Sequence, residues 1–473
     1  MTTIPSSHPS APGRVLSTLN EDGSRRWLRP KLSPGRFWRM RRVVAYVLMV
    51  IFFLIPYLTL NGKPLVLLDV PHRQFTLIGY TFLPTDTLLF MLLLMSIAIS
   101  IFLLTALFGR VWCGWACPQT VYMEFLFRPI ERFFEGGRSG SLAMDKAGGL
   151  KARRLAKNGV YLLLALFLAH TFLAYFVGIE QLVQWVQRSP LEHPTSFLIM
   201  AGTTALIFFD FAYFREQTCL VACPYGRLQS VLLDRQSVIV GYDPIRGEPR
   251  AHQVKDRSSG AGDCIDCGAC VLTCPTGIDI RDGLQMECIH CTQCADACDA
   301  IMDKVGKPRG LIRYTSRDEV EGKPTHLLRP RVILYPAALV VAVGLLAFNL
   351  GTKADTDVTL LRGAGAPFTR QPDGSVVNQV RVKITNRDAA ERSYRLEVSG
   401  VEGASLIAPQ NPVAVPGSRT AETSIFVVVP EDRFGDDRLP SVIRVSDGAG
   451  FTLDIPFELV GPEREHDDAG DGE

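Results

Sequence analysis

Twelve cysteines carry the clearest chemistry in this 473-residue sequence, and eight of them lie between residues 264 and 298. They form two runs of one design, Cys-x2-Cys-x2-Cys-x3-Cys, which begin at Cys264 and Cys288. In bacterial runs with this spacing, three closely spaced thiolates hold one [4Fe–4S] cluster, and the fourth ligates the other cluster. The spacing therefore predicts two clusters and a one-electron relay, which needs a partner to supply or accept the electrons.

The expected ligand sets follow from this crossover of the fourth cysteine. Cluster one is expected on Cys264, Cys267, Cys270 and Cys298, and cluster two on Cys274, Cys288, Cys291 and Cys294. A zinc ribbon would need four ligands in two pairs, whereas each run here is a complete triplet followed by a fourth thiol. Asp299 stands where a proline usually follows the last cysteine, a change that removes no ligand.

The other four cysteines belong to a motif that occurs twice. Cys113 and Cys117 lie in VWCGWACPQT (the first elbow, residues 111–120), and Cys219 and Cys223 lie in QTCLVACPYG (the second elbow, residues 217–226). Both segments read Cys-x-x-Ala-Cys-Pro. A proline is suited to the first turn of a helix, so the cysteine before it is expected at a helix N-terminus.

The surroundings of the elbow cysteines predict lowered thiol pKa values. The positive end of a helix dipole favours a thiolate, and Arg110, Arg215 and Arg227 are expected to act in the same direction. Four soft thiolates could bind Cu(I), zinc or an iron–sulfur cluster, or they could cycle between dithiol and disulfide. The remaining alternative is a set of buried structural cysteines. The repetition of the motif in equivalent places favours a functional site.

The elements that must position these thiols include five apolar runs, each near the length of about 20 helical residues that crosses a hydrocarbon core. They are Val43–Leu60, Thr87–Phe108, Gly159–Val177, Thr195–Tyr213 and Val332–Leu350. Residues 1–42 and 109–158 carry nine Lys and Arg each, whereas residues 61–86 carry two and residues 178–194 carry one. By the positive-inside rule, the N-terminus, the elbows and residues 215–331 are expected in the cytoplasm. Residues 352–473 are then expected outside.

Residues 352–473 differ in composition from the rest, with 13 Lys and Arg against 21 Asp and Glu. Five alternating runs predict strands: Val380–Ile384, Tyr394–Val398, Ser424–Val429, Val442–Val445 and Phe451–Ile455. Turn residues separate them, which is typical of a small immunoglobulin-like β-sandwich. The segment holds no cysteine, so no disulfide stabilises it.

The predicted fold is therefore a polytopic α-helical membrane protein with five spans, an inserted α+β ferredoxin domain with two [4Fe–4S] clusters, and a C-terminal all-β immunoglobulin-like sandwich. The expected parts are a disordered tail (1–35), four spans with two elbows (36–240), the ferredoxin domain (241–331), a fifth span (332–351), the sandwich (352–460) and an acidic disordered tail (461–473). The net charge of +2 gives no sign of a nucleic-acid binder.

The two elbows, the ferredoxin run and the fifth span with its β-sandwich resemble, over about residues 35–460, the CcoG family, also called FixG or RdxA. These are accessory proteins of cbb(3)-type cytochrome c oxidase. The resemblance implies a cupric reductase of the bacterial inner membrane, which converts Cu(II) to Cu(I) for assembly of the oxidase.

In this interpretation the elbow cysteines Cys113, Cys117, Cys219 and Cys223 are the candidate copper site. The expected partners are the oxidase or its assembly factors, a copper exporter or chaperone, and a cytoplasmic or quinol electron donor. Two alternatives stay open. One is a quinol-linked membrane ferredoxin that conducts electrons, and the other is a non-catalytic assembly scaffold whose clusters are structural.

Overall fold

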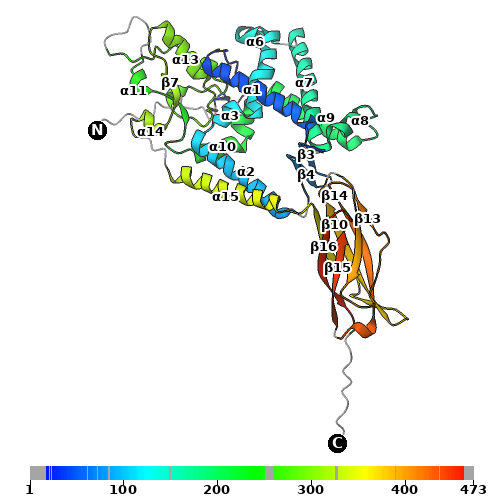
Figure 1. Ribbon diagram of the computed structural model, residues 1–473. Coiled ribbons are helices and arrows are strands. Elements are labelled where there is room, and N and C mark those ends of the chain that lie inside the picture. Colours follow the sequence, from blue (N-terminus) through cyan, green and yellow to red (C-terminus); the bar gives the residue numbers. More distant parts are fainter. Residues whose placement is uncertain are drawn as a thin grey trace. The chain divides into compact units, whose positions relative to one another are not determined.

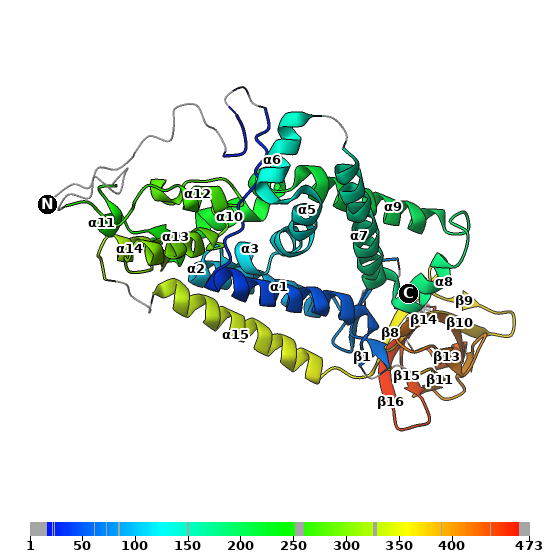
Figure 2. The same ribbon diagram turned by 90° about the horizontal axis from the view of Figure 1, so that it is seen from above.

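The computed structural model describes residues 17–462 except residues 21, 23, 61, 72, 84–85, 149–150, 251–259, 325–328, 389 and 436. The chain forms two compact units (Figures 1 and 2). The first contains the long helices and the cysteine-rich domain, and the second contains the C-terminal β-domain. The disorder expected for residues 1–16 and for the acidic tail beyond residue 462 lies outside the described residues.

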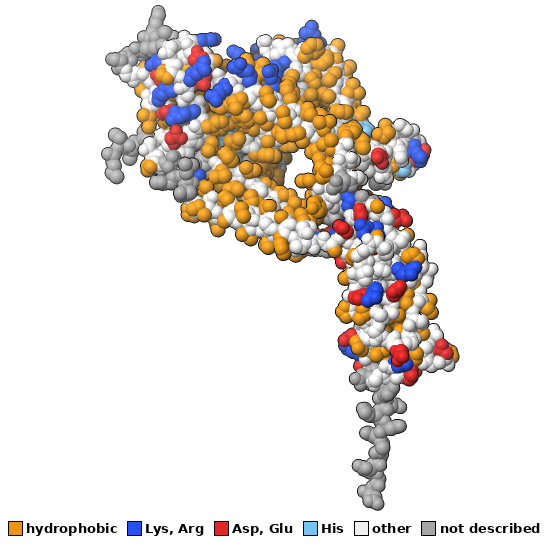
Figure 3. Space-filling model, viewed as in Figure 1, with side chains coloured by type: hydrophobic (Ala, Val, Ile, Leu, Met, Phe, Trp, Pro, Cys, Tyr) orange, Lys and Arg blue, Asp and Glu red, His pale blue; other side chains and the backbone are white. Residues whose placement is uncertain are grey.

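Five helices in the described part of the chain are long and apolar enough to cross a membrane. They are α1 (Arg36–Leu54) continued by η1 (Ile55–Tyr57), α2 (Thr87–Phe108), α7 (Ala152–Val177), α9 (Pro194–Phe209) continued by η3 (Asp210–Phe214), and α15 (Pro330–Gly351). At most 33% of the residues in the apolar window of any span are buried within the protein. The remaining apolar side chains form the hydrophobic surface along these helices in Figure 3, where Lys and Arg are sparse.

The number of spans agrees with the sequence, but the first helix does not coincide with the expected Val43–Leu60. It begins at Arg36, and Thr59–Leu60 forms the short strand β1 instead. The arginines between Arg36 and Arg42 end the apolar run, but their backbones still form helical hydrogen bonds. The apolar run therefore marks only the apolar part of α1. Near its end the helix tightens to the 3-10 turn η1, which contains Pro56, a residue with no backbone N–H to donate.

Shorter elements connect the spans. Those around the two elbows and beyond α7 are α3 (Val111–Trp115), α4 (Pro118–Tyr122), the π-helix η2 (Met123–Phe127), α5 (Arg128–Glu135), α6 (Gly137–Ala147), α8 (Ile179–Val186), the π-helix η4 (Thr218–Ala222) and α10 (Pro224–Leu232). Between α1 and α2 the chain forms β1 (Thr59–Leu60), β2 (Lys63–Pro64), β3 (Val66–Asp69), β4 (Gln74–Leu77) and β5 (Tyr80–Phe82).

The cysteine-rich domain is built around two helices, and each begins inside one of the two cysteine runs. Its elements are β6 (Ile239–Tyr242), α11 (Pro244–Gly247), α12 (Ala269–Thr273), η6 (Ile280–Asp282), α13 (Gln293–Lys304), β7 (Ile312–Thr315) and α14 (Arg317–Val320). Strands β6 and β7 pair antiparallel. Gly268 (φ +65°) and Thr292 (φ +56°) precede α12 and α13, so a left-handed residue follows the second cysteine of each run. The two halves of the domain therefore repeat one backbone design.

The C-terminal unit contains two antiparallel sheets. One has the order β12 (Ser405–Ile407), β14 (Arg419–Pro430), β10 (Ser375–Asn386), β8 (Thr356–Arg362), with β9 (Thr369–Arg370) beside β10. The other has the order β13 (Val413–Val415), β11 (Arg392–Ser399), β15 (Arg438–Ser446), β16 (Thr452–Val460). Buried and less buried residues alternate along β10, whose Val380, Val382 and Ile384 are fully buried. This alternation is the feature that predicted the sandwich, and all five expected runs fall on strands apart from Phe451.

The described residues between 17 and 35, a segment that was expected to be disordered, are held to other parts of the first unit. The Thr18 hydroxyl donates to Oε1 of Gln217 in the second elbow, over 3.2 Å. The Thr273 hydroxyl donates to the Lys31 carbonyl over 2.8 Å. The polar composition that suggested disorder instead supplies hydrogen bonds to partners far away in the sequence. We call residues 17–35 the N-terminal strap.

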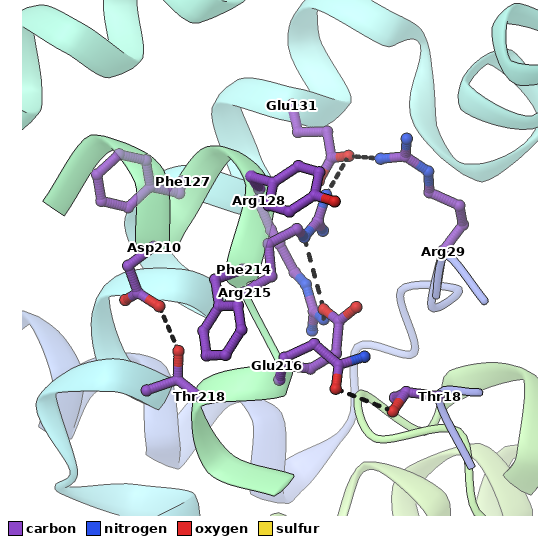
Figure 4. Close-up of polar contacts among 12 residues, drawn as sticks. Thr18, Arg29, Phe127, Arg128, Glu131, Asp210, Phe214, Arg215, Glu216 and Thr218 are labelled. Atoms are coloured by element: carbon purple, nitrogen blue, oxygen red, sulfur yellow. Dashed lines mark hydrogen bonds and ion pairs between the residues drawn. The ribbon is translucent and has the colours of Figure 1, made fainter. Parts of the chain in front are cut away.

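A buried network of ion pairs holds the beginning of the second elbow against α5 (Figure 4). Both terminal nitrogens of Arg215 donate to the Glu131 carboxylate over 3.0 Å, and Arg29 of the strap donates to the same group. The Nε of Arg215 lies 3.5 Å from Glu216, whose carboxylate is 3.9 Å from Arg128. Burial would raise the pKa of Glu131, but Arg215 and Arg29 outweigh it and lower this pKa to about 2.

Loss of the Glu131 charge is expected to destabilise the protein by about 3 kcal/mol, because the buried Arg215 would lose its two-fold pairing with Glu131 and keep only the longer contact with Glu216. The test is the melting temperature of Glu131→Gln in detergent, compared with that of the unsubstituted protein. The folded pKa near 2 lies below the ordinary value of 4.5. The ion pair therefore contributes stability that is fully present above pH 4.5 and is lost as the pH falls towards 2.

The matched control is Glu192→Gln, because Glu192 pairs with Arg188 at 3.7 Å while both side chains are exposed. This substitution is expected to change stability by less than about 0.5 kcal/mol. Equal melting temperatures for the two variants would contradict the role of the Glu131 network.

Candidate iron–sulfur and thiol sites

Four cysteines line a cavity of about 360 Å³ in the cysteine-rich domain. They are Cys264, Cys267, Cys270 and Cys298. The wall also includes Tyr242 of β6 and Arg281 of η6, together with apolar residues of α13 and β7. Cys267 is exposed, whereas Cys264 and Cys270 are buried. This cavity therefore has one sulfur at the protein surface.

A second cavity, of about 340 Å³, is lined by the other four cysteines of the domain. They are Cys274, Cys288, Cys291 and Cys294, and Cys270 lies in the walls of both cavities. Cys288 and Cys291 are each only 7% exposed. The structure thus brings the eight thiols together in two sets of four, of which only the first includes an exposed cysteine. We call Cys274, Cys288, Cys291 and Cys294 the buried cysteine set.

The donor set and the shape of both cavities fit iron–sulfur clusters. In the described part of the chain no group of three or more His, Cys, Asp or Glu side chains is spaced to hold a single metal ion. Thiols arranged around a cavity suit a cluster, because each iron of a [4Fe–4S] cube takes one cysteine. Burial raises the pKa of Cys288 and Cys298 to about 12, so ligation would have to displace their protons.

Each elbow places its second cysteine at a helix N-terminus, as the Cys-Pro motif predicts. Cys117 caps α4 and Cys223 caps α10, and a proline is the first helical residue in both. The backbone N–H groups of Gln119 and Thr120 lower the pKa of the Cys117 thiol, although its side chain accepts no capping hydrogen bond.

The two elbows are neighbours, and Asp210 links them. Its Oδ1 accepts from Gln119 Nε2 in the first elbow, over 3.2 Å, and from the hydroxyl of Thr218 in the second (Figure 4). Gln119 Nε2 also donates to the Arg215 carbonyl over 3.1 Å. The elbow cysteines Cys113, Cys117 and Cys223 all act electrostatically on Cys219. The four elbow thiols thus occupy one neighbourhood.

The predicted lowering of thiol pKa values is wrong for three of the elbow cysteines. Burial raises the pKa of Cys113 to about 11 and that of Cys219 to about 12, and it also raises the pKa of Cys117. Arg110 lowers the pKa of Cys113 in the expected direction, but burial outweighs its effect. Arg215 instead forms the ion pairs with Glu131 and Glu216. These thiols are therefore neutral near pH 7.

The first elbow contacts the loop that carries the buried cysteine set. A Cβ atom on Gly114 would lie 2.6 Å from the Ile289 carbonyl oxygen and 2.9 Å from the backbone nitrogen of Cys291. Cys113, Ile289 and Cys291 form one buried cluster of side chains. Only glycine permits this approach, so Gly114 is a functional residue that the cysteine spacing did not indicate.

A chain of hydrogen bonds runs beside this contact. Trp115 Nε1 donates to the Tyr314 hydroxyl over 2.8 Å, and that hydroxyl donates to the His290 carbonyl over 3.0 Å. The Arg110 backbone N–H donates to His290 Nδ1 over 3.1 Å. Burial lowers the pKa of His290 to about 3, and a neutral ring that accepts at Nδ1 carries its hydrogen on Nε2. His290 thus joins the cysteine-rich domain to the first elbow without adding a charge.

The raised pKa of Cys113 gives a direct test of the burial of the elbow. In metal-free protein, alkylation of Cys113 by iodoacetamide is expected to accelerate by about tenfold per pH unit up to pH 10, because the thiolate fraction does so below the pKa. Mass spectrometry of the Cys113 peptide gives the rate, and free glutathione is the control thiol. A rate that levels off between pH 9 and 10 would show an ordinary or lowered pKa.

Three segments match known protein families. Residues 214–317 match a family described as a 4Fe-4S dicluster domain, and residues 89–136 match one described as a 4Fe-4S binding domain. Residues 346–462 match the family described as an IG-like fold at the C-terminal of FixG. Both elbows, the eight-cysteine run and the β-sandwich therefore lie inside these matches.

Similarity to curated relatives extends over most of the chain. The nitrogen fixation protein FixG of Rhizobium meliloti is 32% identical, and the alignment covers 89% of this chain and 90% of that protein. Protein RdxA of Cereibacter sphaeroides is 36% identical over 79% of this chain and 82% of its own length. A crystal structure of a FixG-related protein from Vibrio parahaemolyticus aligns with 23% of this chain at 14% identity and a TM-score of 0.21.

These matches agree with the architecture of five apolar helices, an iron–sulfur domain and an immunoglobulin-like domain. The protein is a multi-pass membrane protein of the iron–sulfur electron-transfer type. The chain belongs to the FixG/RdxA family, as its elbows and its ferredoxin run indicated.

Proposed function

We propose that this chain is a cupric reductase, which passes single electrons from its cysteine-rich domain to Cu(II) bound at the elbow thiols. The observation that carries the proposal is the contact of Gly114 with Ile289 and Cys291. Through this contact the first elbow packs against the loop of Cys288 and Cys291, which supports the proposal. Electron transfer between the two sites would need no large movement of the chain.

Two [4Fe–4S] clusters are the proposed resident cofactors. Cys264, Cys267, Cys270 and Cys298 would hold cluster one, and Cys274, Cys288, Cys291 and Cys294 would hold cluster two. When bound, such clusters supply one-electron transfer. The protein contributes burial, fixed thiol positions and the contact with the first elbow.

The elbow thiols suit the product of the proposed reaction. Cu(II) takes up one electron and becomes Cu(I), the copper state that soft thiolates prefer. Because burial raises the pKa of Cys113 and Cys219, these two thiols carry their protons at pH 7. Copper binding then displaces thiol protons, so affinity should rise with pH. The proposed site is Cys113, Cys117, Cys219 and Cys223. Among the described residues no three such side chains are already spaced to share one ion, so copper binding would have to draw these sulfurs together.

The proposed orientation follows the distribution of Lys and Arg. The N-terminus, both elbows and the ferredoxin domain would face the bacterial cytoplasm, and the β-sandwich would face the periplasm. The reduced copper would serve assembly of a cbb(3)-type cytochrome c oxidase, through that enzyme or its assembly factors and a copper chaperone or exporter. The electron donor would be a cytoplasmic protein or a quinol.

A second candidate for the elbow site is a third iron–sulfur cluster. The observation in its favour is that residues 89–136, which include Cys113 and Cys117, match a family described as a 4Fe-4S binding domain. Four thiols in one neighbourhood also suit such a cluster.

Metal analysis of anaerobically purified protein separates the two candidates. About eight irons per chain are expected if two [4Fe–4S] clusters are present, and about twelve if the elbows hold a third. EPR of added Cu(II) then reports whether copper is ligated by sulfur. About twelve irons without thiolate-bound copper would exclude the elbows as the copper site.

Replacement of Cys113 and Cys117 by serine tests the proposed reaction itself. Cu(II) reduction by the purified, chemically reduced protein is expected to fall by at least about tenfold, because hard hydroxyls hold Cu(I) poorly. Iron content should stay unchanged. Trp112→Phe is the matched control in the same elbow, since Trp112 is 45% exposed and its replacement keeps all sulfurs. Unchanged copper reduction by the double serine variant would contradict the site assignment.

A further inference from the structure

Arg41 of α1 is a fully buried arginine at the junction of the first elbow and the buried cysteine set. Its Nε donates to the Gly114 carbonyl over 2.7 Å. Its Nη1 and Nη2 atoms are buried and have no hydrogen-bond partner among the described residues. The guanidinium also lies over the Phe125 ring, 5.5 Å from its centroid. Two N–H-bearing nitrogens of a permanent cation are thus left without an acceptor.

Arg41 is joined to the buried cysteine set through Gly114. The Gly114 carbonyl accepts from Arg41, and a Cβ atom on Gly114 would lie 2.9 Å from the Cys291 backbone nitrogen. The buried Glu124 carboxylate attracts Arg41, but it is paired with Arg128 at 2.5 Å and gives Arg41 no hydrogen bond. A buried cation costs free energy unless an anion compensates it. An anionic group ligated by Cys291 would complete that compensation.

The two cavities differ in what opposes reduction. Reduction adds one negative charge, and burial in a low-dielectric interior disfavours the more charged form. Each set contains two cysteines that are 7–8% exposed, but only the first contains an exposed cysteine, Cys267, so cluster one would be solvated more. Arg281 lies in the wall of the first cavity, but Asp266 and Asp279 neutralise its charge. Without a nearby cation, cluster two would be the harder one to reduce. An electron that enters beside Cys267 would then stay on cluster one and would not move to cluster two, beside the first elbow.

We propose that Arg41 is the positioning residue that makes the Cys274/Cys288/Cys291/Cys294 cluster the point at which electrons leave for the first elbow. The inference rests on the proposed ligand sets and deepens the proposed function. Arg41 fixes the Gly114 carbonyl, and its charge favours the reduced state on the buried side. A single electron moves from the Cys267 side to the Cys291 side and then to the acceptor, and no atom or proton is transferred.

The test is an EPR-monitored redox titration of iron-loaded protein without copper, in which the two clusters are followed separately. In Arg41→Gln, the ratio of reduced to oxidised cluster two at a fixed potential is expected to fall by about tenfold, a shift of about 59 mV for one electron. Cluster one should keep its midpoint potential. The matched control is Arg42→Gln, because Arg42 is the next residue of α1 and is exposed, with its guanidinium 4.7 Å from the Trp38 ring centroid.

Two further variants keep the test decisive if Arg41→Gln does not load iron. Arg41→Lys retains the charge. It should change the ratio of reduced to oxidised cluster two by less than about threefold, which is less than half of the 59 mV shift expected for Arg41→Gln. Glu124→Gln removes the opposing charge and should shift cluster two in the other direction. Equal shifts of both clusters, no shift in any variant, or equal effects of Arg41→Lys and Arg41→Gln would overturn the inference. The redox titration contains no copper. A failure of copper reduction would therefore refute the proposed function without changing the outcome of the titration.

Discussion

The carbonyl of Ile289 lies where a side chain of residue 114 would otherwise be, and this backbone contact determines much of the surrounding structure. It brings the first elbow against the loop of Cys288 and Cys291. The contact requires glycine in the elbow, a guanidinium that fixes the Gly114 carbonyl, and hydrogen bonds that hold Trp115 against the cysteine-rich domain. Two sulfur sites from distant parts of the sequence become neighbours as a result.

The same close packing determines the electrostatics of the molecule. Burial of Cys113 and Cys117 outweighs the effects of Arg110 and of the helix N-terminus on the thiol pKa, so these two thiols remain protonated. Charged groups persist in this interior where they meet a partner in good geometry, as Glu131 does with Arg215. Arg41, whose terminal nitrogens have no partner among the described residues, departs from this pattern. The paired charges stabilise the fold, whereas the charge of Arg41 is the one that we propose favours reduction of cluster two.

Local spacing predicted the features that depend on neighbouring residues. Four features depend only on residues that are close together in the sequence. They are the Cys-x2-Cys runs, the Cys-Pro elbows, the apolar spans and the alternation in β10. The structure groups the cysteines as the spacing suggests, although the clusters themselves remain a prediction. Features that depend on distant partners were not predictable. Gly114 is one glycine among 40, and Arg41 looks like part of a positive N-terminal segment. The pKa values of three elbow thiols are raised and not lowered as predicted, because the elbow motif does not reveal how deeply its cysteines are buried.

The N-terminal strap has a consequence for biosynthesis. Its residues leave the ribosome first, but Ser17 donates to the carbonyl of Thr276, which is 259 positions later. At about 5–20 residues per second, roughly 10–50 s of translation separate the two partners. The strap therefore cannot complete its contacts before the helices up to α9, both elbows and the first cysteine run have been made. Ser17 and Thr276 can meet while the second run, which begins at Cys288, is still to be translated.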